Sequence, residues 1–295
     1  MRILLIGANG QVAWELQRTL MPLGEVIALG RNTPGLQLDI TDLESVRRVI
    51  QEIHPHVIVN PAAYTAVDKA ESEPELAMVV NGIAPGVMAE EAKRLNIPLI
   101  HYSTDYVFSG QQQIPYKETD QTNPQNVYGQ TKLVGEQAIQ AVGGKYFIFR
   151  TSWVYGLHSK NFLLTILKLA REREELRVVN DQMGAPTWSR AIAEMTSQIL
   201  AQGMGNLSEF SDRHTGLYHL SASGETSWYD FTQAILRLDP KSAEHRVQRV
   251  IAIPTEQYPT PAQRPANSLL DNSKLVQNFG LALPHWHKSL ELAFE

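Results

Sequence analysis

The residue pair best suited to proton transfer in this sequence is Tyr128 and Lys132, which are four residues apart in an expected helix over 127–142. That spacing places both side chains on one helix face, one turn from each other. An ammonium held beside a phenol favours the phenolate and lowers the pKa of the tyrosine. A tyrosine tuned in this way can give or take a proton at a carbonyl or hydroxyl carbon. An ordinary amphipathic helix has the same spacing, so the surrounding elements must decide.

A glycine turn near the N-terminus predicts a dinucleotide site. The pattern Gly7-x-x-Gly10-x-x-Ala13 follows an apolar run at 3–6 and opens a helix expected over 12–21. Strand, glycine turn and helix in that order bind a pyrophosphate, because glycines let the backbone approach and the helix terminus presents free N–H groups. The first gap is one residue longer than in Gly-x-Gly-x-x-Gly. We expect cofactor contacts from Gly7, Asn9, Gly10, Gln11 and Val12.

Alternating strands and helices predict an α/β fold, a Rossmann-type doubly wound parallel sheet. Strands are expected at 25–29, 57–60, 98–103 and 146–150, and helices at 43–53, 74–95 (interrupted near Pro85) and 127–142. Such alternation gives right-handed βαβ units whose ligands bind at the carboxyl ends of the strands. Further cofactor contacts are therefore expected there, from Gly30, Arg31, Ala62, Ala63, Tyr64, Thr65 and Tyr102.

After residue 150 the pattern becomes less regular. Helices are expected at 161–172, 189–202 and 227–238, and short strands at 176–179 and 218–220. Connections rich in proline and glycine separate them. We expect residues 1–150 to form an NAD(P)-binding domain and 151–295 to form mainly a smaller, substrate-binding lobe, with some later segments returning to the first domain.

Composition excludes several classes of protein. The chain has 295 residues, a net charge of −5, 43% hydrophobic residues and no cysteine. It lacks the basic footprint of a nucleic-acid-binding protein, and it has neither disulfides nor thiolate metal sites. The N-terminal apolar run is too short for a signal peptide or a membrane span. We expect a cytoplasmic protein with no membrane partner.

Several motifs together carry a family resemblance. Gly7-x-x-Gly10, Thr104 at the end of the fourth strand, and Tyr128-x-x-x-Lys132 resemble an extended short-chain dehydrogenase/reductase. The stretches 60–71, 103–108, 151–156 and 180–187 narrow the resemblance to the dTDP-4-dehydrorhamnose reductases, over nearly the whole chain. The resemblance implies reduction of dTDP-4-dehydro-β-L-rhamnose to dTDP-L-rhamnose by NAD(P)H. The pathway that uses the product stays open.

The resemblance also implies roles for individual residues. Tyr128 would protonate the alkoxide left by hydride transfer, Lys132 would lower its pKa and bind the nicotinamide ribose, and Thr104 would hydrogen-bond the same oxygen. Dehydratases of the superfamily carry glutamate at the position of Tyr106, so dehydration is disfavoured. The expected substrate contacts are Thr104, Asp105, Tyr106, Tyr128, Trp153, Asn161 and Gln182.

The end of the second strand favours NADPH, with NADH as the alternative. The sequence there reads Leu29-Gly30-Arg31-Asn32, without the acid that binds the 2′-hydroxyl of NAD. An arginine accommodates the 2′-phosphate of NADP. Asp39 and Ile40 would lie against the adenine, although Asp39 could serve only as a loop or capping residue.

Some reductases of this family hold Mg²⁺ with acids at a dimer interface. Glu15 is present, and Glu291 or Glu295 could contribute, but Arg190 stands where a further acid is expected. We therefore predict no metal, and leave open whether the chain is a homodimer. The alternative functions are another NDP-4-keto-6-deoxysugar reductase, an epimerase or dehydratase that keeps NAD bound, and a non-catalytic subunit like the regulatory subunit of methionine adenosyltransferase.

Overall fold

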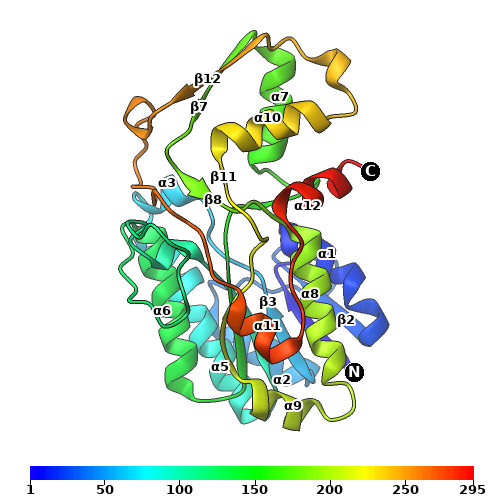
Figure 1. Ribbon diagram of the computed structural model, residues 1–295. Coiled ribbons are helices and arrows are strands. Elements are labelled where there is room, and N and C mark those ends of the chain that lie inside the picture. The colour runs from blue at the N-terminus through cyan, green and yellow to red at the C-terminus, as the bar shows by residue number, and fades with distance from the viewer.

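A computed structural model describes residues 1–295 (Figure 1) and is built on a six-stranded, wholly parallel sheet. The strand order is β10-β5-β4-β3-β1-β2. The strands are β1 (Arg2–Ile6), β2 (Glu25–Leu29), β3 (Val57–Asn60), β4 (Leu99–Thr104), β5 (Tyr146–Thr151) and β10 (Gly216–His219). The order reverses between β1 and β3, and this switch point leaves a crevice at the carboxyl ends of the strands. The predicted fold class is confirmed.

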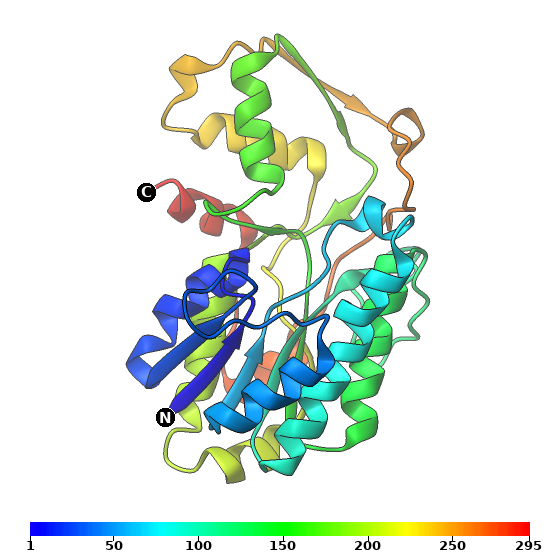
Figure 2. The same cartoon turned by 180° about the vertical axis from the view of Figure 1, so that it is seen from behind.

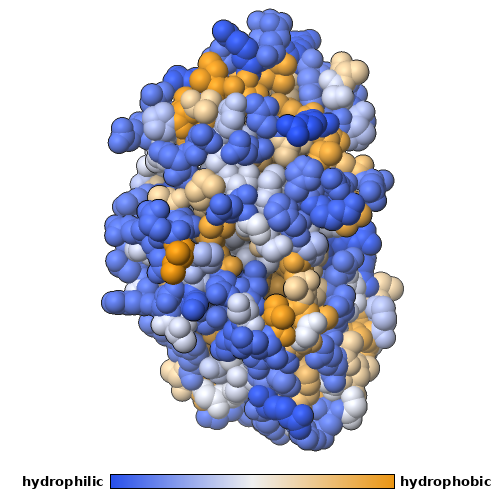
Figure 3. Space-filling view, viewed as in Figure 1, coloured by the Kyte–Doolittle hydropathy of each residue, from blue (hydrophilic) through white to orange (hydrophobic).

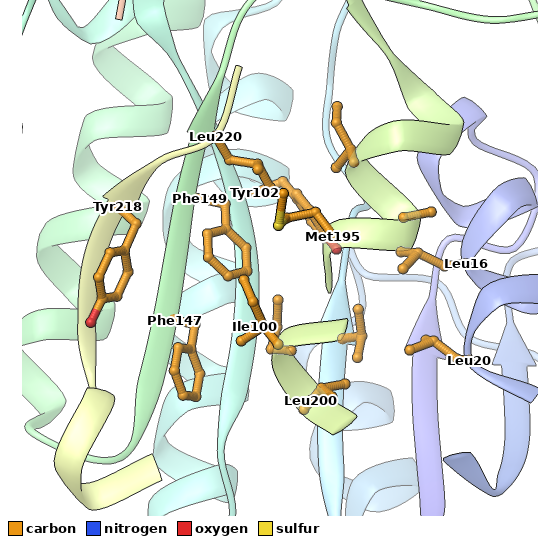
Figure 4. Packing of buried hydrophobic residues seen from close by; sticks show 14 of the residues in the cluster. Leu16, Leu20, Ile100, Tyr102, Phe147, Phe149, Met195, Leu200, Tyr218 and Leu220 are labelled. Atoms are coloured by element: carbon orange, nitrogen blue, oxygen red, sulfur yellow. The ribbon is translucent and has the colours of Figure 1, made fainter. Parts of the chain in front are cut away.

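Side-chain alternation along the strands builds one core on each face of the sheet. Ile3 and Leu5 of β1 belong to a cluster beneath α1 (Gln11–Thr19), α8 (Ser189–Gln202) and α11 (Ser273–Phe279), part of which is drawn in Figure 4. Leu4 and Ile6 belong to the opposite cluster, beneath α2 (Leu43–Ile53), α5 (Ala84–Arg94) and α6 (Val127–Val142). Figure 2, in which the molecule is turned by 180°, shows the side of the sheet covered by α2, α5 and α6. Successive strand residues point to opposite faces, so both faces must be covered.

The predicted break near Pro85 is confirmed and takes the form of a π-helical turn, η2 (Val79–Ile83), between α4 (Pro74–Met78) and α5. Pro85 has no N–H to continue an α-helical ladder. The carbonyl of Asn81 faces α6 so closely that a Cβ on Gly135 would lie 2.1 Å from it. The Asn81 side chain bonds the Tyr64 backbone, accepting from N at 2.8 Å and donating to O at 3.1 Å, and also donates to the Thr131 hydroxyl on α6 at 3.2 Å. The break therefore positions a loop of the site.

The rest of the later half forms an upper lobe. Its core gathers around Phe231 and Trp286, between α7 (Phe162–Glu172), α10 (Trp228–Leu238) and α12 (Trp286–Ala293). A parallel ribbon pairs β7 (Glu175–Val179) with β12 (Arg249–Ile253). The sequence pattern missed β12 and α9 (Leu207–His214). Although they lie late in the chain, α8 packs on α1, and β10 extends the main sheet beside β5.

Short elements complete the chain. They are η1 (Met21–Leu23), α3 (Val67–Ala70), η3 (Asp105–Val107), β6 (Val154–Tyr155), β8 (Met183–Gly184), β9 (Thr187–Trp188), β11 (Thr226–Ser227), η4 (Ser242–Glu244) and η5 (Thr255–Gln257). The face in Figure 3 is mostly hydrophilic, with several separate apolar patches. None of the helices is both long and apolar enough to cross a membrane.

Candidate active site

A cavity of about 690 Å³ opens at the carboxyl ends of β1 to β5. Every residue predicted to contact the cofactor lines it: Gly7, Asn9, Gly10, Gln11, Val12, Gly30, Arg31, Asp39, Ile40, Ala62, Ala63, Tyr64, Thr65, Tyr102, Tyr128 and Lys132. The structure thus brings together residues that are up to 125 positions apart in the chain (132 − 7). Their contact with a dinucleotide stays a prediction, but their convergence on one cavity is a property of the fold.

The glycine turn suits a diphosphate. Gly7 has φ +89°, and a Cβ there would lie 2.8 Å from the Cβ of Ala62, so a side chain would close the cradle. Gly10 is the N-cap of α1 and offers no side-chain cap, and no acid stands in the first turn. The first N–H groups of a helix lack intrahelical partners and carry a partial positive charge. The residues present therefore fit the phosphates of a dinucleotide.

At the other end of the cavity Arg31 and Asp39 lie close together. The Asp39 carboxylate accepts hydrogen bonds from the N–H (2.9 Å) and the hydroxyl (2.8 Å) of Thr41. Burial opposes ionisation, but these bonds and the charge of Arg31 lower the pKa of Asp39. Asp39 therefore stabilises its own loop, as the capping alternative required, while it also lines the cavity.

Lys132 lies on α6, and its side chain contacts residues of strand β4 in the main sheet. Its Nζ donates to the Tyr102 carbonyl at 2.6 Å and lies 3.1 Å from Nε2 of His101. Burial lowers the pKa of Lys132 to about 8, partly opposed by Glu136. The pKa of Tyr128 is raised by burial, against the effect of a hydrogen bond with Thr104. Burial outweighs the opposing hydrogen bond, so the pKa of Tyr128 is raised overall, and a lowering by Lys132 stays a prediction.

Sequence reasoning missed two polar residues behind Lys132. Nδ2 of Asn60 lies 3.1 Å from Nδ1 of His101, and Oδ1 of Asn60 accepts from the N–H of Ala62 at 3.2 Å. Burial and the charge of Lys132 hold the pKa of His101 well below its usual range, so the ring is neutral. A signal for them is present in the sequence: each is a polar residue that directly follows apolar residues of a strand. In the structure the two strands are adjacent, and Asn60 and His101 are register partners.

Thr104, Asp105 and Tyr106 form a second cluster, beside Tyr128 but outside the cavity lining. The Thr104 hydroxyl donates to Oδ1 of Asp105 at 3.1 Å, and the rings of Tyr106 and Tyr128 meet edge to face with centroids 5.5 Å apart. Oδ2 of Asp105 is buried without a partner. Burial raises the pKa of Asp105 to about 6, although the hydrogen bond from Thr104 opposes the rise. A buried carboxylate with a free oxygen is typical of a functional site.

The predicted substrate residues of the lobe stack on, or hydrogen-bond with, other side chains. Trp153, with φ +48°, stacks on Trp228 with centroids 3.5 Å apart. Asn161 caps α7 and donates to Oε1 of Gln11 at 2.9 Å. Gln182 donates to the Thr255 hydroxyl at 3.1 Å and accepts from the indole of Trp228 at 3.2 Å. None of the three lines the cavity, and their contact with a substrate stays a prediction.

Two of the residues considered for a metal site, Arg190 and Glu291, form ordinary ion pairs. Arg190 pairs with Glu194 at 2.9 Å, and Glu291 pairs with Lys288 at 3.0 Å. No group of three or more histidine or acidic side chains is arranged to hold a metal ion.

Comparison with known proteins gives a consistent result. The family described as RmlD substrate binding domain matches residues 1–295. A dTDP-4-dehydrorhamnose reductase of Burkholderia thailandensis is 48% identical, over 99% of this chain and 97% of that relative. The reductase of Escherichia coli K12 is 47% identical, over 97% and 94%.

Solved structures agree with the sequence comparison. The crystal structure of a Bacillus anthracis dTDP-4-dehydrorhamnose reductase in complex with NADP is 37% identical, covers 99% of this chain and 98% of its own, and superposes with a TM-score of 0.88. A UDP-glucose 4-epimerase of Thermotoga maritima, 17% identical with a TM-score of 0.80, covers 100% of this chain and 97% of its own, and shares the fold.

Proposed function

Because this chain belongs to the family of dTDP-4-dehydrorhamnose reductases, we propose that it reduces the C4 ketone of dTDP-4-dehydro-β-L-rhamnose to give dTDP-L-rhamnose, with NADPH as the hydride donor. The NADP held by the Bacillus anthracis relative supports this choice of cofactor. The observation that carries the proposal is that Tyr128 and Lys132 line the same cavity as the glycine turn. A proton donor and a dinucleotide site in one cavity are what ketone reduction requires.

Tyr128 is the proton donor in this proposal. When bound, the nicotinamide supplies a hydride to C4, and the C4 oxygen then needs a proton. The pKa of Tyr128 is raised by burial, so the phenol carries its proton at neutral pH and can give it up when negative charge develops on that oxygen. We assign to Thr104 a hydrogen bond to the same oxygen, which would stabilise the charge of the transition state.

Lys132 binds and orients rather than donating directly. Its Nζ has three hydrogens, of which one is held by the Tyr102 carbonyl. A second can meet the ribose of the nicotinamide. Because its pKa is about 8, Lys132 can be charged or neutral near physiological pH. Asp105 and Tyr106, which adjoin Tyr128 and Thr104, are the proposed sugar contacts.

A coupled assay tests the activity. The protein is incubated with dTDP-4-dehydro-6-deoxyglucose, a 3,5-epimerase and NADPH, and absorbance of the reduced nicotinamide is followed. We expect NADPH to be consumed one per substrate, and the reaction to depend on the epimerase. Product formation without net consumption of NADPH would support the epimerase alternative. Absence of turnover, with the protein folded and able to bind NADPH, would contradict the proposal and favour a regulatory subunit.

A further inference from the structure

The loop between β6 and α7, residues 156–161, reaches back from the later half of the chain onto the glycine turn. We call it the clamp loop. The Ser159 hydroxyl donates to the Asn9 carbonyl at 3.1 Å, and Nδ2 of Asn161 donates to Oε1 of Gln11 at 2.9 Å. Asn9 lies in the glycine turn, and Gln11 is the first residue of α1. The clamp loop is thus hydrogen-bonded to the segment expected to bind a diphosphate.

An aromatic stack fixes the same loop to the next turn of α1. The ring of His158 lies parallel to the indole of Trp14, with centroids 4.1 Å apart and planes 7° apart. The guanidinium of Arg18 also lies over this indole, 4.1 Å from its centroid. Trp14 is 38% exposed, so an otherwise solvent-facing tryptophan serves as the surface on which the clamp loop rests.

The clamp loop carries a cation to the cavity. Ser159 has φ +63°, a left-handed conformation that is unfavourable for a residue with a side chain. Beyond this turn Lys160 lines the cavity together with Gly7, Gly10 and Val12. The other basic side chains in the lining are engaged or distant: Lys69 pairs with Glu73 at 2.7 Å, Lys132 is held by Tyr102, and Arg31 adjoins Asp39. Lys160 has no ion-pair partner.

We propose that Lys160 binds the diphosphate of the dinucleotide from the side opposite the amino end of α1. This inference rests on the proposed function for the identity of the cofactor. A diphosphate carries two negative charges, whereas the end of α1 offers backbone N–H groups and only a partial positive charge. A lysine supplies a full point charge for phosphate oxygens. The stack of His158 on Trp14 positions this lysine without contacting the cofactor.

The proposal makes a distinction that can be measured. The diphosphate is common to NADPH and NADH, so loss of Lys160 should weaken both equally, whereas a residue at the 2′-phosphate should affect NADPH alone. Adenosine 2′-monophosphate, which lacks the diphosphate, should bind equally well with and without Lys160. Electrostatic attraction across the cavity should also weaken as salt is added.

The test is a set of equilibrium dissociation constants, measured by nicotinamide fluorescence for the two dinucleotides and by competition for adenosine 2′-monophosphate. For Lys160→Gln we expect roughly tenfold weaker binding of NADPH and of NADH, with partial recovery in Lys160→Arg. His158→Ala should weaken both dinucleotides by a smaller factor. The matched control is Lys168→Gln on α7, because Lys168 is 72% exposed, pairs with Glu172 and does not line the cavity.

The outcomes separate this inference from the proposed function. If the wild-type protein binds NADPH and Lys160→Gln binds it equally well, the inference is overturned and the proposed function stands. An effect on NADPH alone would place Lys160 at the 2′-phosphate and also overturn it. If the wild-type protein does not bind either dinucleotide, the proposed function fails, and this inference fails with it.

Discussion

The cofactor-facing and substrate-facing parts of the site differ in how directly the sequence determines them. On the cofactor side, most of the predicted residues lie near strand ends or in the glycine turn, Tyr128 and Lys132 lie on α6, and all of them line one cavity. On the substrate side, Trp153, Asn161 and Gln182 are engaged with Trp228, Gln11 and Thr255. Strand ends meet at one edge of a parallel sheet whatever the loops do. In the lobe, the neighbours of a side chain depend on packing between segments that are far apart in the sequence.

The largest effect should come from the residue that joins the two parts. Tyr128→Phe removes the proposed proton donor while leaving the ring that meets Tyr106 edge to face. We expect kcat to fall by about 10²–10⁴-fold, the range found for general acids, with the dissociation constant of NADPH nearly unchanged. Tyr258→Phe, at a tyrosine that is 59% exposed, is the matched control. A kcat within threefold of the wild type would remove Tyr128 from the mechanism.

Trp153 tests whether the substrate side is correctly assigned. If stacking on Trp228 is its main role, Trp153→Ala should lower the free energy of unfolding by about 3 kcal/mol, the low end for large aromatic residues. Trp228→Ala should do likewise, and the double variant should lose less than the sum because the stack is lost only once. Denaturant unfolding measures all three. Unchanged stability with a tenfold higher KM would instead restore Trp153 as a sugar contact.

The boundaries of α2, α6 and α8 match the predicted ranges, because a helical period and end signals such as Asp42, which caps α2, lie within the segment itself. The ribbon strand β12 was missed, since its pairing with β7 joins residues 74 positions apart (249 − 175).

For the site, too, the sequence predicts some features and not others. Chain order placed Tyr128 and Gly7 in one cavity, but it could not show that burial sets the pKa of Tyr128 or that His101 lies behind Lys132. Burial and hydrogen-bond partners of a side chain depend on elements that are remote in sequence.

Asp105 offers a pH test on the boundary between the two parts. Its pKa rises from 3.8 to about 6 on folding, so between these values the folded protein binds more protons than the unfolded chain. Its contribution to stability is therefore fully present below pH 3.8 and is lost as pH rises through about 6. We expect the free energy of unfolding to fall by roughly 2 kcal/mol across that window, relative to Asp105→Asn. Unfolding measured at several pH values checks this, with Asp212→Asn on α9 as the surface control. Parallel pH curves for wild type and Asp105→Asn would show that Asp105 is solvated, contrary to its burial.

The smallest effect should come from Arg31, at the end of the cofactor side that depends least on packing. Arg31 lines the cavity and adjoins Asp39, whose Oδ1 accepts both hydrogen bonds from Thr41. Arg31→Ala should raise the KM for NADPH by about tenfold, because one charge-assisted contact to the 2′-phosphate is lost, and leave the KM for NADH within twofold. Steady-state kinetics with both cofactors measures this difference. An unchanged KM for NADPH would mean that the 2′-phosphate is bound by other residues. The sequence would then have predicted the position of Arg31 correctly and its role wrongly.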